Sequence, residues 1–189
     1  MKHILKDLVR PTSIFLRRPV IALLLAALAP RLVIAWFPCT YLIQFGPLID
    51  DSFYCFSIAR NIAFGLGFTF DTLAPTNGYH PLWIVLITPI YMLTHDVYLP
   101  IHWILTLSAI VDTAAVYFLY KLLQRFLPPR AAWLGCLVYA FSPHVLFSVA
   151  GPMNGLETAL NICLILAYSN VFITLVRKTV FPLIAVQIN

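Results

Sequence analysis

The run PLWIVLITPIYMLT, residues 81–94, decides which way the rest of the chain crosses a membrane. It is almost wholly apolar, yet its 14 residues are fewer than the roughly 20 that a helix needs to span a bilayer. His80 and Pro81 suit the start of a helix, and Trp83 suits the membrane–water interface. We therefore predict that residues 81–94 form a surface helix that does not cross.

The basic residues on either side of this run support the same prediction. If residues 81–94 stay at the surface, ten of the twelve basic residues lie on one side of the membrane, which by the positive-inside bias is the cytoplasm. A crossing at 81–94 would place the 121–130 cluster and the 177–178 pair outside, against that bias. The ten are Lys2, Lys6, Arg10, Arg17, Arg18, Lys121, Arg125, Arg130, Arg177 and Lys178.

Composition sets the class of protein. The chain has 189 residues, of which 61% are apolar and 10% charged, and its mean hydropathy is +0.91. A soluble domain carries about a quarter charged residues. The composition therefore excludes a soluble enzyme, a disordered tail and a nucleic-acid binder, and the net charge of +5 is accounted for by membrane topology. We predict an all-α polytopic membrane protein with a single membrane domain over residues 1–189.

Four apolar segments are candidate membrane spans. We predict a cytoplasmic segment at 1–18, spans at 19–38, 98–120, 131–149 and 156–176, and an external loop with surface helices at 39–97. The apolar residues after Lys178 indicate the start of a fifth span. A cleaved signal peptide ending near Ala29 is the alternative for the first segment, but the basic stretch before it is long and apolarity continues to Phe37.

The external loop contains a predicted amphipathic helix. Residues 52–63 place Tyr54, Ile58 and Ile62 on one face, and the acidic pair Asp50-Asp51 comes directly before them. Asp51 suits the N-cap of this helix, and the glycines at 65 and 67 suit its end. Such a helix would lie on the membrane with its aromatic side chains in the headgroup region.

Three acids are predicted to gather at the outer face. Asp50 and Asp51 repel each other, which costs stability unless the helix N-terminus, a divalent cation or a cationic substrate compensates. Glu157 lies at the outer end of the last span and could approach them in space. A capping pair that faces water, with Glu157 as a separate cap, is the structural alternative.

Two charged residues fall inside predicted spans. Arg31 and Asp112 are costly in a bilayer unless they are paired or functional, so we predict an ion pair between the first and second spans.

A disulfide between Cys39 and Cys55 in the external loop is conceivable.

Three motifs carry a resemblance to a known family. They are DDSFYCFSIARNIAFGLGFTF (50–70), PTNGYHPLW (75–83) and GLETAL (155–160). The first two resemble the first external loop of bacterial GT-C glycosyltransferases, the superfamily of the protein O-mannosyltransferases and the lipid A aminoarabinose transferase. The third resembles the GMETAL element of the same enzymes.

The resemblance implies glycosyl transfer from a polyprenyl-phosphate sugar donor to an acceptor at the outer face of the bacterial plasma membrane. It implies that Asp50 is the general base or orients the acceptor, and that Asp51 supports it or touches a metal. Glu157 matches a second acidic site beside the acceptor or metal. His80 matches a position near the donor phosphate. A divalent metal ion is a candidate cofactor.

Arg60 is the only arginine expected outside the membrane, so it is a candidate ligand for the donor phosphate. Binding of lipid headgroups by a helix-face arginine is the alternative. The family generally has many more spans than this chain, so we expect the chain to hold the presumed catalytic face without turning over alone. Two non-enzymatic hypotheses stay open: a transporter or flippase fragment, and a small partner subunit.

Overall fold

The structure is a computed structural model that describes residues 14–187, and all of its regular secondary structure over that range is helical, with no strand. This confirms the all-α prediction for the described residues. Most of the predicted cytoplasmic segment 1–18 lies outside them. The helices are α2 (Ile14–Ala35), α3 (Cys39–Gln44), α4 (Asp50–Ala63), α5 (Pro81–Met92), α6 (Leu99–Leu123), α7 (Pro129–Ala140), α8 (Pro143–Phe147) and α9 (Thr158–Gln187).

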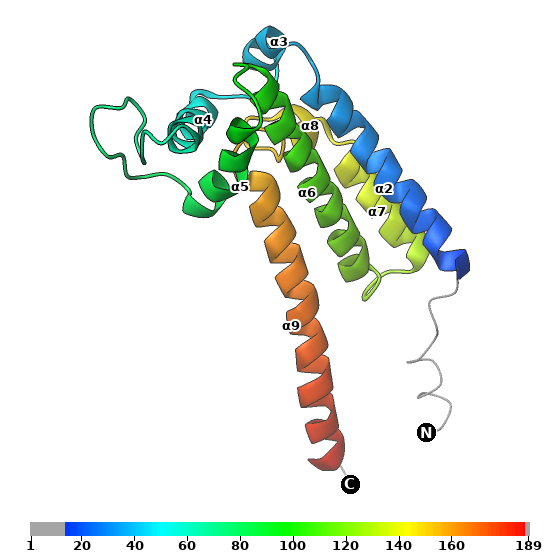
Figure 1. Cartoon of the computed structure of the whole chain (residues 1–189). Helices are drawn as coiled ribbons and strands as arrows, with labels where there is room; N and C mark the ends of the chain where they lie inside the picture. The colour runs from blue at the N-terminus through cyan, green and yellow to red at the C-terminus, as the bar shows by residue number, and fades with distance from the viewer. Residues whose placement is uncertain (1–13, 188–189) are drawn as a thin grey trace.

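Three of the described helices are long and apolar enough to cross a bilayer. They are α2 over Arg18–Ala35, α6 over Leu99–Leu123, and α9 over Thr158–Thr179. Figure 1 shows them running along one another with α7, while α3, α4, α5 and α8 gather at one end of this bundle. That end holds every candidate site residue, and we call it the loop end. The other end, where α6 meets α7, we call the basic end.

The expected span at 131–149 is not one helix. It is divided into α7, which has 12 residues, and the short α8, with Phe141 and Ser142 between them. Pro143 explains the break, because the residue before a proline is pushed out of the helical conformation and the proline has no N–H to continue the hydrogen bonds. Ser142 accordingly has extended backbone angles, with φ −62° and ψ 126°.

The apolar residues after Lys178 do not begin a separate span. They continue α9, which runs unbroken from Thr158 to Gln187. Arginine and lysine are good helix formers, so the basic pair at 177–178 does not end the helix.

The predicted ion pair in the membrane is confirmed. Arg31 Nε donates to Asp112 Oδ2 at 2.6 Å, and both side chains are fully buried. Arg31 Nη1 also donates to the carbonyl of Ala140 at 3.1 Å, and the Tyr139 hydroxyl donates to Asp112 Oδ1 at 2.7 Å. The pair therefore joins α2, α6 and α7. Such partners are what a buried charge requires in order to be tolerated.

Candidate active site at the loop end of the bundle

The acidic pair begins α4. Asp50 and Asp51 are the first two residues of the helix, and both are exposed. The prediction that Asp51 is the N-cap is wrong: Ile49 is the N-cap, and its N–H donates to the Ser52 hydroxyl at 3.3 Å. Two carboxylates in the first turn are still favourable there, because they face the positive end of the helix dipole.

The prediction that α4 ends at the glycines 65 and 67 is confirmed, since its last residue is Ala63. Gly65 has a φ of +77°, and its N–H donates to the carbonyl of Ile62 at 3.0 Å. The N–H of Leu66 donates to the carbonyl of Asn61 at 2.8 Å. These two bonds form a Schellman motif, which turns the chain away from the helix axis.

The loop before α9 is packed onto the start of α4. Residues 151–155 are all buried. The Ser52 hydroxyl donates to the carbonyl of Asn154 at 2.5 Å, and the Asn154 side chain donates to the carbonyl of Val149 at 3.0 Å. The residue after the acid pair is thus bonded to the loop that carries Glu157.

Gly155 makes this packing possible. Its φ is +80°, and a Cβ added there would lie 2.8 Å from Phe56 Cζ and 2.9 Å from Leu48 Cδ2. Its carbonyl accepts a hydrogen bond from Trp83 Nε1 at 3.0 Å. Trp83 is 1% exposed, so the prediction that it anchors α5 in the interface is wrong: it is a buried contact between α5 and the loop.

His80 and Glu157 meet at this junction. His80 Nδ1 lies 3.3 Å from Glu157 Oε1, and the two side chains are 55% and 19% exposed. The other carboxylate oxygen, Oε2, is buried and has no hydrogen-bond partner among the described residues. The site therefore offers a histidine open to solvent and a carboxylate with one free acceptor.

The Cys55 thiol lies within reach of the charges of two of the three acids, Glu157 and Asp51. Burial raises the pKa of its thiol to about 11, and the negative charges of Glu157 and then Asp51 add to the effect. Both carboxylates must lie near this thiol for their charges to act on it. Cys39 and Cys55 are free thiols, so the conceivable disulfide is not formed.

Arg60 lies away from the other candidate residues. It is at the last turn of α4, about 15 Å along the helix axis from Asp50 by the rise per residue. Its guanidinium lies 5.7 Å from the centroid of the Phe64 ring. It also lines a small cavity of about 140 Å³ together with Tyr91 and Asp96. The structure therefore places Arg60 beside Asp96 and at the opposite end of α4 from Asp50 and Asp51.

The residues do not form a complete metal cage. Within the described part of the chain, no three His, Cys, Asp or Glu side chains are placed to hold a metal ion. A divalent ion beside Asp50 and Asp51 would need ligands from a substrate phosphate and water, as Mg²⁺ commonly does.

Sequence reasoning named Asp50, Asp51, His80 and Glu157 but missed the residues that join their loops. These are Ser52, Trp83, Asn154 and Gly155. Comparisons with protein families, with curated proteins and with solved structures found no match for this chain. The function is therefore argued from the site and from the motifs.

Proposed function

We propose that the chain forms the catalytic face of a GT-C-type glycosyltransferase, which moves a sugar from a polyprenyl-phosphate donor to an acceptor hydroxyl at the outer face of a bacterial plasma membrane. The observation that carries the proposal is the contact between His80 and Glu157 beside the Asp50-Asp51 helix start. Two resembling motifs that lie close together in the sequence, and a third that follows much later, supply these residues.

Asp50 is the proposed general base. An alcohol is a weak nucleophile until a carboxylate takes its proton, and Asp50 is an exposed carboxylate that an acceptor can reach. The acceptor oxygen then bonds to the anomeric carbon of the sugar, and the bond from that carbon to the phosphate oxygen breaks. The electron pair leaves with the polyprenyl phosphate, and the proton goes to Asp50. Asp51 keeps the local potential negative and supports Asp50 in this role.

His80 and Glu157 are proposed to bind the reacting groups. The His80 imidazole would lie against the phosphate and donate a hydrogen bond to it as negative charge develops there. Glu157 Oε1 orients this imidazole, while the unpartnered Oε2 can accept a hydrogen bond from a sugar or acceptor hydroxyl. Binding would thereby satisfy a buried acceptor that has no partner in the free protein.

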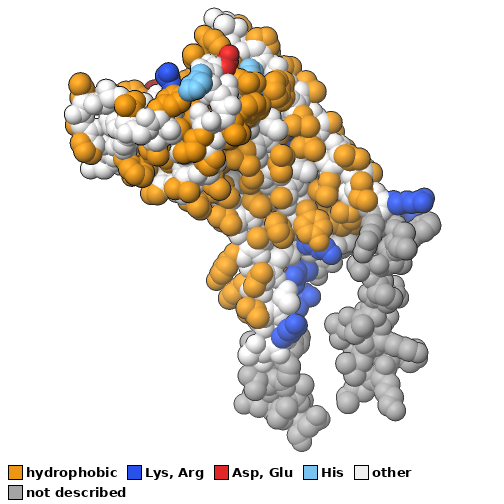
Figure 2. Space-filling view, viewed as in Figure 1, with side chains coloured by type: hydrophobic (Ala, Val, Ile, Leu, Met, Phe, Trp, Pro, Cys, Tyr) orange, Lys and Arg blue, Asp and Glu red, His pale blue; other side chains and the backbone are white. Residues whose placement is uncertain are grey.

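The surroundings suit a lipid-linked donor. Large apolar side chains are exposed in the loop after α4, including Leu66, Phe68, Phe70 and Leu73. A polyprenyl chain would approach the site through membrane lipid and such a surface. Figure 2 shows apolar side chains over the sides of the molecule that would face the lipid.

The test is sugar transfer in membranes that contain the complete enzyme of which this chain is the proposed catalytic face. Undecaprenyl phosphate carrying tritiated mannose, glucose or aminoarabinose is supplied as the donor. The transfer of labelled sugar from this lipid to acceptors in the membrane is measured. Asp50→Asn should abolish transfer at normal membrane levels. Glu157→Gln should reduce transfer about 10- to 100-fold, the value of a hydrogen bond to a charged group. Asp71→Asn is the control, because Asp71 lies in the same loop but outside the site. Wild-type transfer by Asp50→Asn would refute the proposal.

One observation favours the small partner subunit as a second candidate. Only 11% of the spanning window of α9 is buried, which leaves most of this helix free to pack against other protein. A stable complex in which Asp50→Asn changes neither assembly nor activity would favour that candidate. No comparable observation favours transport, because the charged residues Arg31 and Asp112 inside the spans are fully buried and paired.

A further inference from the structure

A groove at the basic end lies between α6 and α9. It has a volume of about 500 Å³ and no acidic residue among those that line it. One wall carries Tyr117, Phe118 and Lys121 of α6 together with Arg125 in the turn that follows it, and the other carries α9 residues between Ala167 and Leu175. The groove therefore combines two cations with an apolar and aromatic lining.

Arg125 is held in place by α9. Its Nη2 donates to the carbonyl of Asn170 at 3.0 Å and to the Thr174 hydroxyl at 2.8 Å. Its Nε is buried and has no hydrogen-bond partner in the described part of the chain. The guanidinium is thus positioned by one nitrogen and keeps further donor capacity, while no carboxylate neutralises it among residues 14–187.

Lys121 adds a second positive charge in the last turn of α6, four residues before Arg125. Its Nζ lies 5.7 Å from the centroid of the Tyr117 ring, which holds the ammonium at the groove by a cation–π contact. Every described acidic residue except the paired Asp112 belongs to the loop end of the molecule. Figure 2 shows the same separation, with most Lys and Arg side chains gathered away from the Asp, Glu and His side chains.

We propose that this groove binds the phosphodiester headgroup of an anionic phospholipid of the cytoplasmic leaflet. The negative phosphate would lie at Lys121 and Arg125, and an acyl chain would lie along Phe118, Val171 and Leu175. Basic pockets between membrane helices are known to take such headgroups. The apolar walls favour a lipid over free phosphate. The proposal does not depend on the proposed catalytic function.

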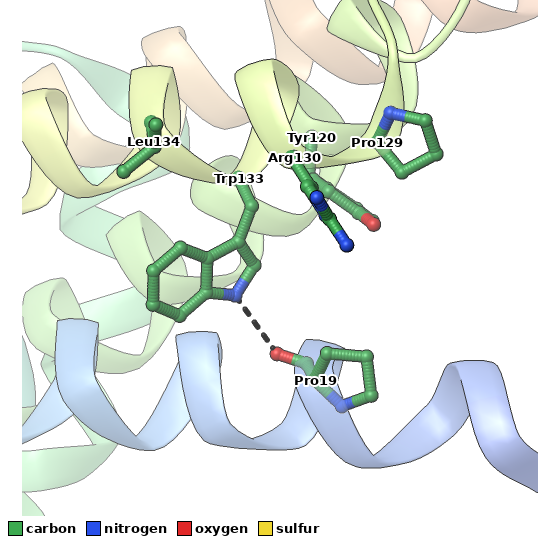
Figure 3. A pocket seen from close by; sticks show the side chains of 6 residues that line it. All are labelled: Pro19, Tyr120, Pro129, Arg130, Trp133 and Leu134. Atoms are coloured by element: carbon green, nitrogen blue, oxygen red, sulfur yellow. Dashed lines mark hydrogen bonds between the residues drawn. The ribbon is translucent and has the colours of Figure 1, made fainter.

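A second cavity at the same end provides a control. It has a volume of about 440 Å³ and lies between the starts of α2 and α7, with Arg130 as its only charged lining residue (Figure 3). Two polar groups that line this cavity already bond to each other, because Trp133 Nε1 donates to the carbonyl of Pro19 at 3.1 Å. Arg130→Gln therefore removes one charge from the basic end without changing the α6–α9 groove.

The test measures lipid binding to the purified full chain by native mass spectrometry in detergent. Phosphatidylglycerol and phosphatidylcholine are titrated separately. Phosphatidylglycerol should bind more tightly. Lys121→Gln should weaken its binding about fivefold, which corresponds to the roughly 1 kcal/mol per surface cation, while Lys121→Arg should keep it. Ala167→Phe, which fills the groove but keeps every charge, should weaken binding as well. Arg130→Gln should leave it unchanged.

Three results would overturn the proposal. Equal binding of the two lipids would show that the charge is not recognised. An equal loss in Arg130→Gln and Lys121→Gln would show a diffuse effect of net charge. Displacement of phosphatidylglycerol by an equal concentration of inorganic phosphate would show that the site takes free phosphate and that the apolar walls contribute nothing.

Discussion

Arg31 and Asp112 join three helices through one buried ion pair. Removing one partner leaves the other as an uncompensated buried charge, which is far more costly than removing both. We expect Asp112→Asn to destabilise the folded protein by roughly 3–5 kcal/mol. The double variant Arg31→Met, Asp112→Leu should lose less than either single variant. Unfolding in mixed micelles with rising denaturing detergent measures both.

A control comes from Thr113, the neighbour of Asp112 in α6. Its hydroxyl donates only to the carbonyl of Ala109 one turn earlier in the same helix, at 2.7 Å. Thr113→Val should therefore cost about 1 kcal/mol or less. If Asp112→Asn costs no more than Thr113→Val, the ion pair does not hold these helices together.

At the scale of elements, the loop before α9 is the part that assembles the candidate site. It bonds to α4 through Ser52 and to α5 through Trp83, and both contacts pass through residues 154 and 155. The helices α4, α5 and α9 all begin at this junction. Asp50, His80 and Glu157 lie at or next to these helix starts, and the loop fixes the positions of the starts relative to one another. The loop is consequently where a small change in backbone should have a large effect.

We expect Gly155→Ala to be much more damaging than Gly78→Ala. Both glycines have a φ near +80°, so each substitution carries the left-handed penalty of about 1–2 kcal/mol. A Cβ at 155 would also meet Phe56 and Leu48, whereas a Cβ at 78 would meet nothing within 4 Å. The overpacking should add about 1–3 kcal/mol. Thermal unfolding and sugar transfer should both show the difference, and equal losses would contradict this account of the loop.

At the scale of the whole molecule, charge divides the structure into two ends. The described acids, apart from Asp112, belong to the loop end, and Lys121, Arg125 and Arg130 belong to the basic end (Figure 2). The short α5 packs against α4 and α6 with Ile84 and Ile87 fully buried. One face of this 12-residue helix is therefore covered by protein, and that it does not cross the membrane stays a prediction.

The orientation of the two ends can be measured by cysteine labelling. In a chain without native cysteines, Asn77→Cys should react with a membrane-impermeant maleimide on intact cells. Phe126→Cys, which replaces a 68% exposed side chain, should react only after lysis. Reaction at both positions in intact cells would mean that residues 81–94 cross the membrane. Reaction at Phe126→Cys alone would mean that the whole molecule is inverted.

Several features were predictable from the sequence because they depend on composition and on local rules. Apolar segments in a charge-poor chain must be helices if they enter a bilayer, since the backbone has no water to bond there. The pairing of Arg31 with Asp112 was predictable for a similar reason, because an unpaired charge inside a bilayer is costly. Pro143 also carries a local signal for a helix break, and the prediction of one span over 131–149 overlooked it.

Other features were decided only by the tertiary structure. The contact of His80 with Glu157 and the burial of Trp83 both depend on how the loop before α9 packs against α4 and α5. The periodicity and the charges of the sequence indicate which face of a helix is apolar. They carry no information on which loop lies against which helix start. That depends on close packing between segments far apart in the chain, where one Cβ at Gly155 would be enough to prevent the contact.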